Sequence, residues 1–149
     1  TRPRNGETAQ VDGLEMAWTH TWESGFGFQM NATVVNSASD GTTLEGLGNS
    51  QNAIGFYEKD SFQARIAFNN REAFLQTIAN GDTGQPENVA TYGQWDVSAS
   101  YDINEHFTVI FEGVNITDEY VEKFGSIPSH FTEQVRSGSR YAVGVRGSF

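Results

Sequence analysis

The sequence of 149 residues predicts an all-β protein with one antiparallel sheet of about seven strands. Apolar and polar residues alternate with a period of two over most of the chain, as in strands whose two faces meet different surroundings. Turn-forming residues separate these stretches. No segment has convincing helical spacing, and the nearest competitor, residues 70–80, has apolar residues at mixed intervals.

The first four predicted strands lie at residues 13–22, 25–36, 52–58 and 61–71. In the first, second and fourth, even-numbered positions hold mostly aromatic or aliphatic residues, and odd-numbered positions hold mostly polar or small ones. The stretch 52–58 alternates more weakly. Charged residues in the three clear strands fall on odd positions, so each of these strands has one face without charge.

The last three predicted strands lie at residues 91–102, 106–115 and 140–149, where apolar residues occupy odd-numbered positions. The final strand ends on Phe149 and carries charge on one face only, at Arg140 and Arg146. This two-faced pattern is typical of a half-buried strand in a soluble sheet and also of a membrane barrel wall.

The connections between the predicted strands alternate in length. Three are short and rich in Asp, Asn, Ser and Gly, and three are long. In chain order they cover residues 23–25, 37–50, 58–61, 72–88, 102–105 and 117–139. Because successive antiparallel connections lie at opposite ends of a sheet, the short turns are predicted at one end, beside Phe149. Transmembrane barrels have this division into short turns and long loops.

The composition excludes several classes of protein. The formal net charge of −10 argues against a nucleic-acid partner, which requires a basic surface. The absence of cysteine excludes disulfides and thiolate metal sites. No run of roughly 18 apolar residues predicts a transmembrane helix. The N-terminal residues include neither an initiator Met nor an apolar leader, which indicates a mature or truncated product.

Two interpretations of the apolar face remain open. It is either the core of a soluble sandwich or small barrel, or the lipid-facing surface of a membrane barrel. Two features favour the membrane barrel. The polar face is rich in Ser, Thr, Asn and Gln, and both lysines, Lys59 and Lys123, lie outside the clear strands. Aromatic residues also gather beside the short turns, as at a membrane interface: Trp22, Phe26, Tyr57, Phe62, Tyr101 and Phe107.

Several stretches of the sequence resemble one known family. GQWDVSASYDINEHFTVIFEGVNITDE, residues 93–119, and SRYAVGVRGSF, residues 139–149, are similar to the C-terminal end of TonB-dependent outer-membrane receptors. Residues 9–22 and 56–75 resemble the preceding hairpins of that family. The corner at Asn115–Asp118 and the last strand are the most specific parts of the resemblance.

The resemblance implies a transmembrane barrel in the bacterial outer membrane that takes up a scarce nutrient, such as a ferric siderophore, a carbohydrate or a cobalamin-like compound. Barrels of this family have about 22 strands, so residues 1–149 are expected to form the C-terminal part, without the plug domain or the TonB box. The implied partners are the rest of the barrel, the plug, the TonB complex, the barrel-assembly machinery, outer-membrane lipid and a small nutrient ligand. No cofactor, metal or nucleic acid is expected.

The resemblance also implies a role for the last strand in assembly. In this family a terminal aromatic residue and alternating apolar positions are recognised by the barrel-assembly machinery. The matching residues are Tyr141, Val143, Val145 and Phe149, whereas Gly147 stands where a bulky residue is usual. Phe149 is alternatively a plain lipid-facing residue of the aromatic belt.

Charged residues on the polar face form the first candidate site. They are predicted to face the lumen and to contact the plug or line a substrate path, or alternatively to pair with one another across neighbouring strands: Glu15, Arg65, Asp96, Glu112 and Arg146. Arg65 and Arg71, which share this face, are also candidate contacts for an anionic ligand.

Aromatic residues of the long loop before the last strand form the second candidate site. They are predicted to stack on an external ligand, or alternatively to pack on neighbouring loops: Tyr120, Phe124, His130 and Phe131. No enzyme is predicted, because His20, His106 and His130 are dispersed and no Ser, His and acid occur in a recognisable order.

A small self-contained β-barrel that binds a ligand is the alternative to the receptor interpretation. It requires an eighth strand, from residues 72–78 or 87–93, and pairing of the first strand with the last. An outer-membrane enzyme is a third hypothesis, for which the sequence offers no catalytic constellation.

Overall fold

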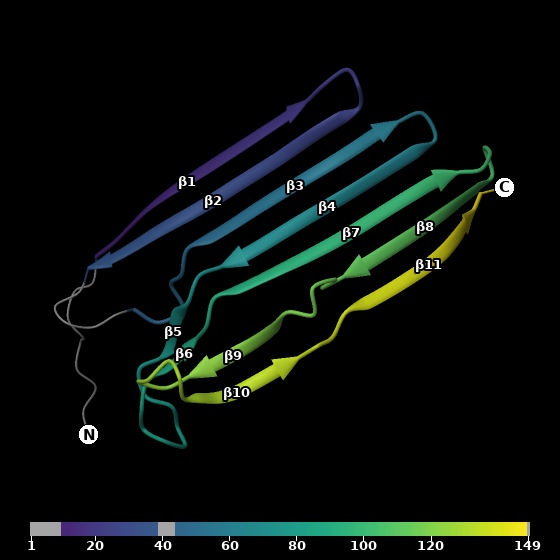
Figure 1. Ribbon diagram of the computed structural model, residues 1–149. Coiled ribbons are helices and arrows are strands. Elements are labelled where there is room, and N and C mark those ends of the chain that lie inside the picture. The colour runs from purple at the N-terminus through teal and green to yellow at the C-terminus, as the bar shows by residue number, and fades with distance from the viewer. Residues whose placement is uncertain (1–9, 39–43, 149) are drawn as a thin grey trace.

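The computed structural model describes residues 10–38 and 44–148, and this part of the chain contains strands and no helix (Figure 1). The strands are β1 (Gln10–Thr21), β2 (Phe26–Ala38), β3 (Ser50–Lys59), β4 (Phe62–Arg71), β5 (Phe74–Thr77), β6 (Glu87–Val89), β7 (Tyr92–Asp102), β8 (Phe107–Val114), β9 (Tyr120–Phe124), β10 (Phe131–Arg136) and β11 (Arg140–Gly147). The predicted all-β class is confirmed.

The long strands form one antiparallel sheet of seven strands in the order β1-β2-β3-β4-β7-β8-β11. Every neighbouring pair in this sheet is antiparallel. The predicted number of main strands and their antiparallel pairing are therefore confirmed, and the strand boundaries differ from the predicted ones by a few residues.

The short strands form a second antiparallel sheet in the order β10-β9-β6-β5, which the sequence did not predict. It lies at the long-connection end of the main sheet (Figure 1). Both segments considered for an eighth strand contribute to it: Phe74 pairs with Val89 across β5 and β6. Neither joins the main sheet. The helical alternative for residues 70–80 is also wrong, because this stretch contains the end of β4 and all of β5.

The short turns gather at one end of the main sheet, as predicted (Figure 1). Backbone hydrogen bonds join them to neighbouring strands. The N–H of Glu58 donates to the carbonyl of Gly25 at 2.8 Å, and the N–H of Asp102 donates to the carbonyl of Ser61 at 2.8 Å. Ser148, at the end of β11, donates to the carbonyl of His106 at 2.9 Å. Phe149 lies outside the described residues.

The register places the predicted apolar residues together on one face. Directly opposite residues in antiparallel strands share a face. One such row runs Trp18–Met30–Ala53–Phe68–Trp95 across β1, β2, β3, β4 and β7. A separate row on the opposite face runs Thr21–Gly27–Phe56–Arg65–Ser98–Glu112–Ala142. The predicted division into an apolar and a polar face is confirmed.

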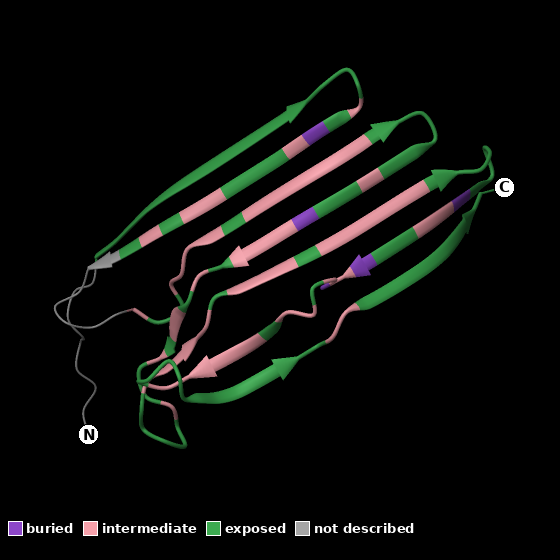
Figure 2. Ribbon diagram, in the orientation of Figure 1, coloured by how far each residue is buried: buried purple, intermediate pink, exposed green. Residues whose placement is uncertain are grey.

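The main sheet buries almost no apolar side chain. Within the described part of the chain, Ala67 is the only buried hydrophobic residue, at 4% exposure. On the apolar face Trp18 is 64% exposed and Val143 is 76% exposed (Figure 2). A folded domain normally gains most of its stability from buried apolar surface. This sheet is a single layer whose apolar face is not covered by the described chain.

The main sheet is also open, with β1 and β11 at its two edges. The small self-contained barrel needs these two strands to pair with each other. They lie at opposite sides of the sheet (Figure 1), so the chain does not close on itself and that interpretation is wrong for this chain alone.

Candidate functional site

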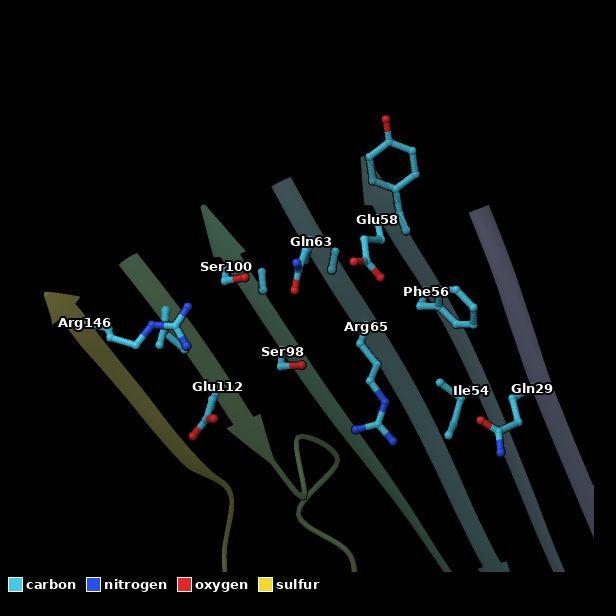
Figure 3. A pocket seen from close by; sticks show the side chains of 14 residues that line it. Gln29, Ile54, Phe56, Glu58, Gln63, Arg65, Ser98, Ser100, Glu112 and Arg146 are labelled. Carbon is cyan, nitrogen blue, oxygen red and sulfur yellow. The ribbon is translucent and has the colours of Figure 1, made fainter. Parts of the chain in front are cut away.

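A trough on the polar face lies over β7 (Figure 3). Its volume is about 550 Å³. Ser98 and Ser100 of β7 form the floor because their side chains are short. Longer side chains form the walls, with Arg65 on β4 at one side and Glu112 and Arg146 on β8 and β11 at the other. The hollow therefore follows from residue size along one strand.

Three of the predicted lumen-facing charges meet at this trough. Arg65 and Glu112 lie in the same cross-strand row, separated by Ser98. None of Arg65, Glu112 and Arg146 forms an ion pair with any residue that the structure describes. These three charges therefore do not pair with one another across strands, which was the alternative interpretation. The trough presents both signs of charge to whatever lies above it.

Asp96 has a structural contact that distinguishes it from the trough charges. One of its carboxylate oxygens accepts hydrogen bonds from the Nε2 of Gln94 at 2.6 Å and from the backbone N–H of Asn115 at 2.9 Å. Asp96 thus supports the corner that follows β8. Glu15, the remaining member of the predicted group, lies on the exposed edge strand β1, away from the trough.

The corner at Asn115–Asp118 redirects the chain from β8 into β9. Asn115 and Asp118 have φ of 54° and 55°, in the left-handed region that Asn and Asp tolerate better than most residues. Asn115 is 1% exposed, and its side chain both donates to the carbonyl and accepts from the N–H of Glu119, at 2.8 Å each. Asp118 forms an ion pair with Arg136 at 3.0 Å.

The predicted loop aromatics lie on or beside the hairpin of β9 and β10. Phe124 and Phe131 are cross-strand partners, so the hairpin brings them together. Tyr120 lies at the other end of β9, with the guanidinium of Arg136 5.8 Å from its ring centroid. His130 is in the turn between the strands. The long connection predicted here contains an ordered hairpin, which the sequence did not predict.

Lys123 holds the same hairpin together through charge. Its ammonium is 2.6 Å from the carboxylate of Glu133 on β10 and 3.8 Å from that of Glu87 on β6. The hydrogen bond to Glu133 is the main cause that raises the pKa of Lys123 above its ordinary value, and the charges of Glu133 and Glu87 add to it. This residue joins three strands of the second sheet.

Three of the four predicted assembly residues lie in β11, and the fourth, Phe149, is outside the described residues. Tyr141, Val143 and Val145 lie on the apolar face and are exposed. The end of the strand is fastened to the turn before β8, where the Nδ1 of His106 is 3.0 Å from the carbonyl oxygen of Ser148. Since that carbonyl can only accept, Nδ1 carries the proton.

Sequence reasoning missed the second sheet and the pocket that it forms with the main sheet. This pocket lies beside Arg71, whose guanidinium stacks on the ring of Phe74 at 3.6 Å. The sequence did place Arg71 on the polar face. The stack was not visible in the sequence, because it depends on the turn of the chain between β4 and β5.

Other kinds of site are not found in the described residues. No group of three or more His, Asp or Glu side chains is arranged to hold a metal ion there. No helix long and apolar enough to cross a membrane occurs among them. Comparisons with models of known protein families, with curated proteins and with solved structures found no match to this chain.

Proposed function

We propose that this chain is the C-terminal part of the barrel of a TonB-dependent outer-membrane receptor that takes up a scarce nutrient. The observation that carries the proposal is the exposed apolar face of a single-layer sheet. Water is a poor environment for such a face, because each Å² of apolar surface costs about 25 cal/mol relative to burial. Lipid chains would cover it without any further protein layer.

The distribution of charge supports lipid on this face. In the seven strands of the main sheet, Asp12 and Lys59 are the charged residues on this face, and each lies at or near a strand end. Between the ends, the rows consist of aromatic, aliphatic, small and uncharged polar residues. A charge near the bilayer midplane costs about 2–4 kcal/mol in a barrel strand, which accounts for this distribution. Strand lengths of 8 to 13 residues also suit a tilted membrane crossing.

An aromatic belt beside the short turns also supports the proposal. Phe26 and Tyr57 have ring centroids 4.6 Å apart, and Tyr57 and Phe62 have centroids 6.1 Å apart. Tyr101 continues the belt as the cross-strand partner of Phe62. Such belts form where lipid tails meet headgroups. In the proposed receptor, this end of the sheet faces the periplasm.

The polar face and the open edges require partners, which the proposed receptor supplies. Unpaired backbone groups at β1 and β11 cost several kcal/mol each in lipid, so the rest of the barrel would pair with both edges. The plug would rest on the trough, where Arg65, Glu112 and Arg146 have no ion pair in the described chain. Siderophores, carbohydrates and cobalamin-like compounds remain the proposed substrate classes, and coupling to the TonB complex belongs to the parts outside this segment.

The proposal has a direct test in site-specific thiol labelling, since this chain has no cysteine of its own. Ile66→Cys and Gln63→Cys place a thiol on opposite faces of β4. In outer-membrane vesicles that contain the full product of the gene, we expect a lipid-soluble maleimide to label position 66 and a membrane-impermeant one to spare it. Position 63 should react with the impermeant reagent after the plug is displaced by urea. Equal labelling of both positions by the impermeant reagent would contradict lipid on the apolar face.

A further inference from the structure

The pocket beside Arg71 lies where the two sheets meet, at the long-connection end. It has a volume of about 400 Å³ and is lined by parts of β4, β5, β6, β7 and β9. Its lining is mainly apolar, from Phe74, Val89 and Val121, with the polar groups of Arg71 and Tyr92 at the same site. An apolar pocket with a few placed polar groups is the usual form of a small-molecule site.

Arg71 is held in place without a carboxylate partner. Its guanidinium lies 3.6 Å from the centroid of the Phe74 ring, and its Nη2 donates a hydrogen bond to the carbonyl of Gly46 at 3.3 Å. No acidic side chain among the described residues forms an ion pair with it. Stacking orients the plane of the guanidinium, so its N–H groups are positioned to bind an anion such as a carboxylate.

Tyr92 is the direct cross-strand neighbour of Arg71 and lies beside it in the pocket. The hydroxyl of Tyr92 donates to the Oε1 of Gln94 at 2.6 Å, so it already has a hydrogen-bond partner within the chain. Among the described residues that line the pocket, Arg71 is the one cationic side chain, so the anionic group of a ligand would lie on Arg71 and its apolar body against Val89 and Val121.

We propose that this pocket binds a small amphipathic carboxylate, with the carboxylate on Arg71 and a flat apolar body against Phe74, Val89 and Val121. As the ligand site of a receptor, it rests on the function proposed above, since it then lies at the external mouth of the barrel. The binding itself is a property of the described residues and does not depend on transport.

The test is a titration of the full chain in detergent micelles with 2-naphthoate, followed by calorimetry. Neutral 2-naphthalenemethanol, which has the same ring system, reports the apolar contribution and partition into micelles. We expect Arg71→Gln to weaken naphthoate binding about tenfold or more and to leave the alcohol unchanged, because only the charged contact is lost. Arg140→Gln is the matched control, since Arg140 is an exposed arginine on the polar side of the sheet but does not line the pocket.

Three results would overturn the proposal: no naphthoate binding to the unmodified chain beyond micelle partition, equal affinity in Arg71→Gln, or the same loss in Arg140→Gln. Phe74→Leu gives a second measurement with the pocket kept apolar, and it should weaken naphthoate binding by a smaller factor. Far-ultraviolet circular dichroism of each variant checks that the sheets have formed. Failure here would leave the thiol-labelling result untouched, so this proposal and the receptor function fail separately.

Discussion

Asn115 shows how one buried side chain sets the path of the chain at the end of β8. It is the largest fully buried side chain in the described residues. At this corner, where φ is positive, its amide forms hydrogen bonds with both the N–H and the carbonyl of Glu119. Asp96 holds the same residue from β7 through its backbone N–H. A single amide thus joins the main sheet to the start of the β9–β10 hairpin.

We expect Asn115→Ala to lower the free energy of unfolding by about 2–4 kcal/mol, because the partly buried N–H and carbonyl of Glu119 lose their partners and Ala is strained at positive φ. Urea unfolding followed by tryptophan fluorescence measures this. Asn115→Gly loses the same hydrogen bonds but is not strained at positive φ. Its free energy of unfolding should therefore lie between those of the unmodified chain and Asn115→Ala. A loss below about 0.5 kcal/mol in Asn115→Ala would mean that the corner is held by other contacts.

The corner was predicted from the resemblance, but its hydrogen bonds were not. The sequence Asn115-Ile116-Thr117-Asp118 indicates a turn. Which backbone groups the Asn115 side chain reaches depends on the φ of 54°, and a single sequence does not determine that angle.

At the scale of elements, long strands were predicted well and short ones were not. The seven main strands have 8 to 13 residues, enough for several periods of alternation. β5, β6, β9 and β10 have 3 to 6 residues, too few to distinguish alternation from chance. Their pairing depends on contacts such as the ion pair of Lys123 with Glu133. These contacts join segments that lie in different predicted loops or in different halves of one loop.

The pKa of Lys123 gives the second sheet a defined pH response. Because Glu133 raises the pKa of Lys123 above 10.5, the ion pair stabilises β9 and β10 at neutral pH and up to pH 10.5, and this stabilisation is lost as pH rises through the raised value. Titration of the Lys123 side chain by ¹³C NMR should therefore give a value above 10.5. Glu133→Gln should lower that value, because it removes the main cause of the shift. An unchanged titration in Glu133→Gln would show that Glu133 does not act on Lys123.

At the scale of the whole molecule, the described residues form a sheet with two faces and two edges, and they bury no apolar side chain larger than Ala67. Alternation in the sequence predicted both faces. It did not predict what covers them, because a soluble core and a lipid surface select the same apolar residues. The first and last of the predicted strands were expected to be the edges of the sheet, and β1 and β11 have these positions.

The edges lead to a prediction about the assembled protein. In an edge strand, every second backbone N–H points away from its one neighbour and has no partner in the sheet. In the isolated chain in micelles, the outward N–H groups of β1 and β11 should exchange with solvent much faster than those of the central strands β4 and β7. In the full product of the gene, pairing with added strands should slow both edges by at least about tenfold, which corresponds to roughly 1.4 kcal/mol. Hydrogen exchange with mass spectrometry measures residues 14–21 and 140–146 in the two samples. Protection of both edges in the isolated chain at low concentration would mean that β1 and β11 pair with each other, and the proposed place of this sheet in a larger barrel would then be wrong.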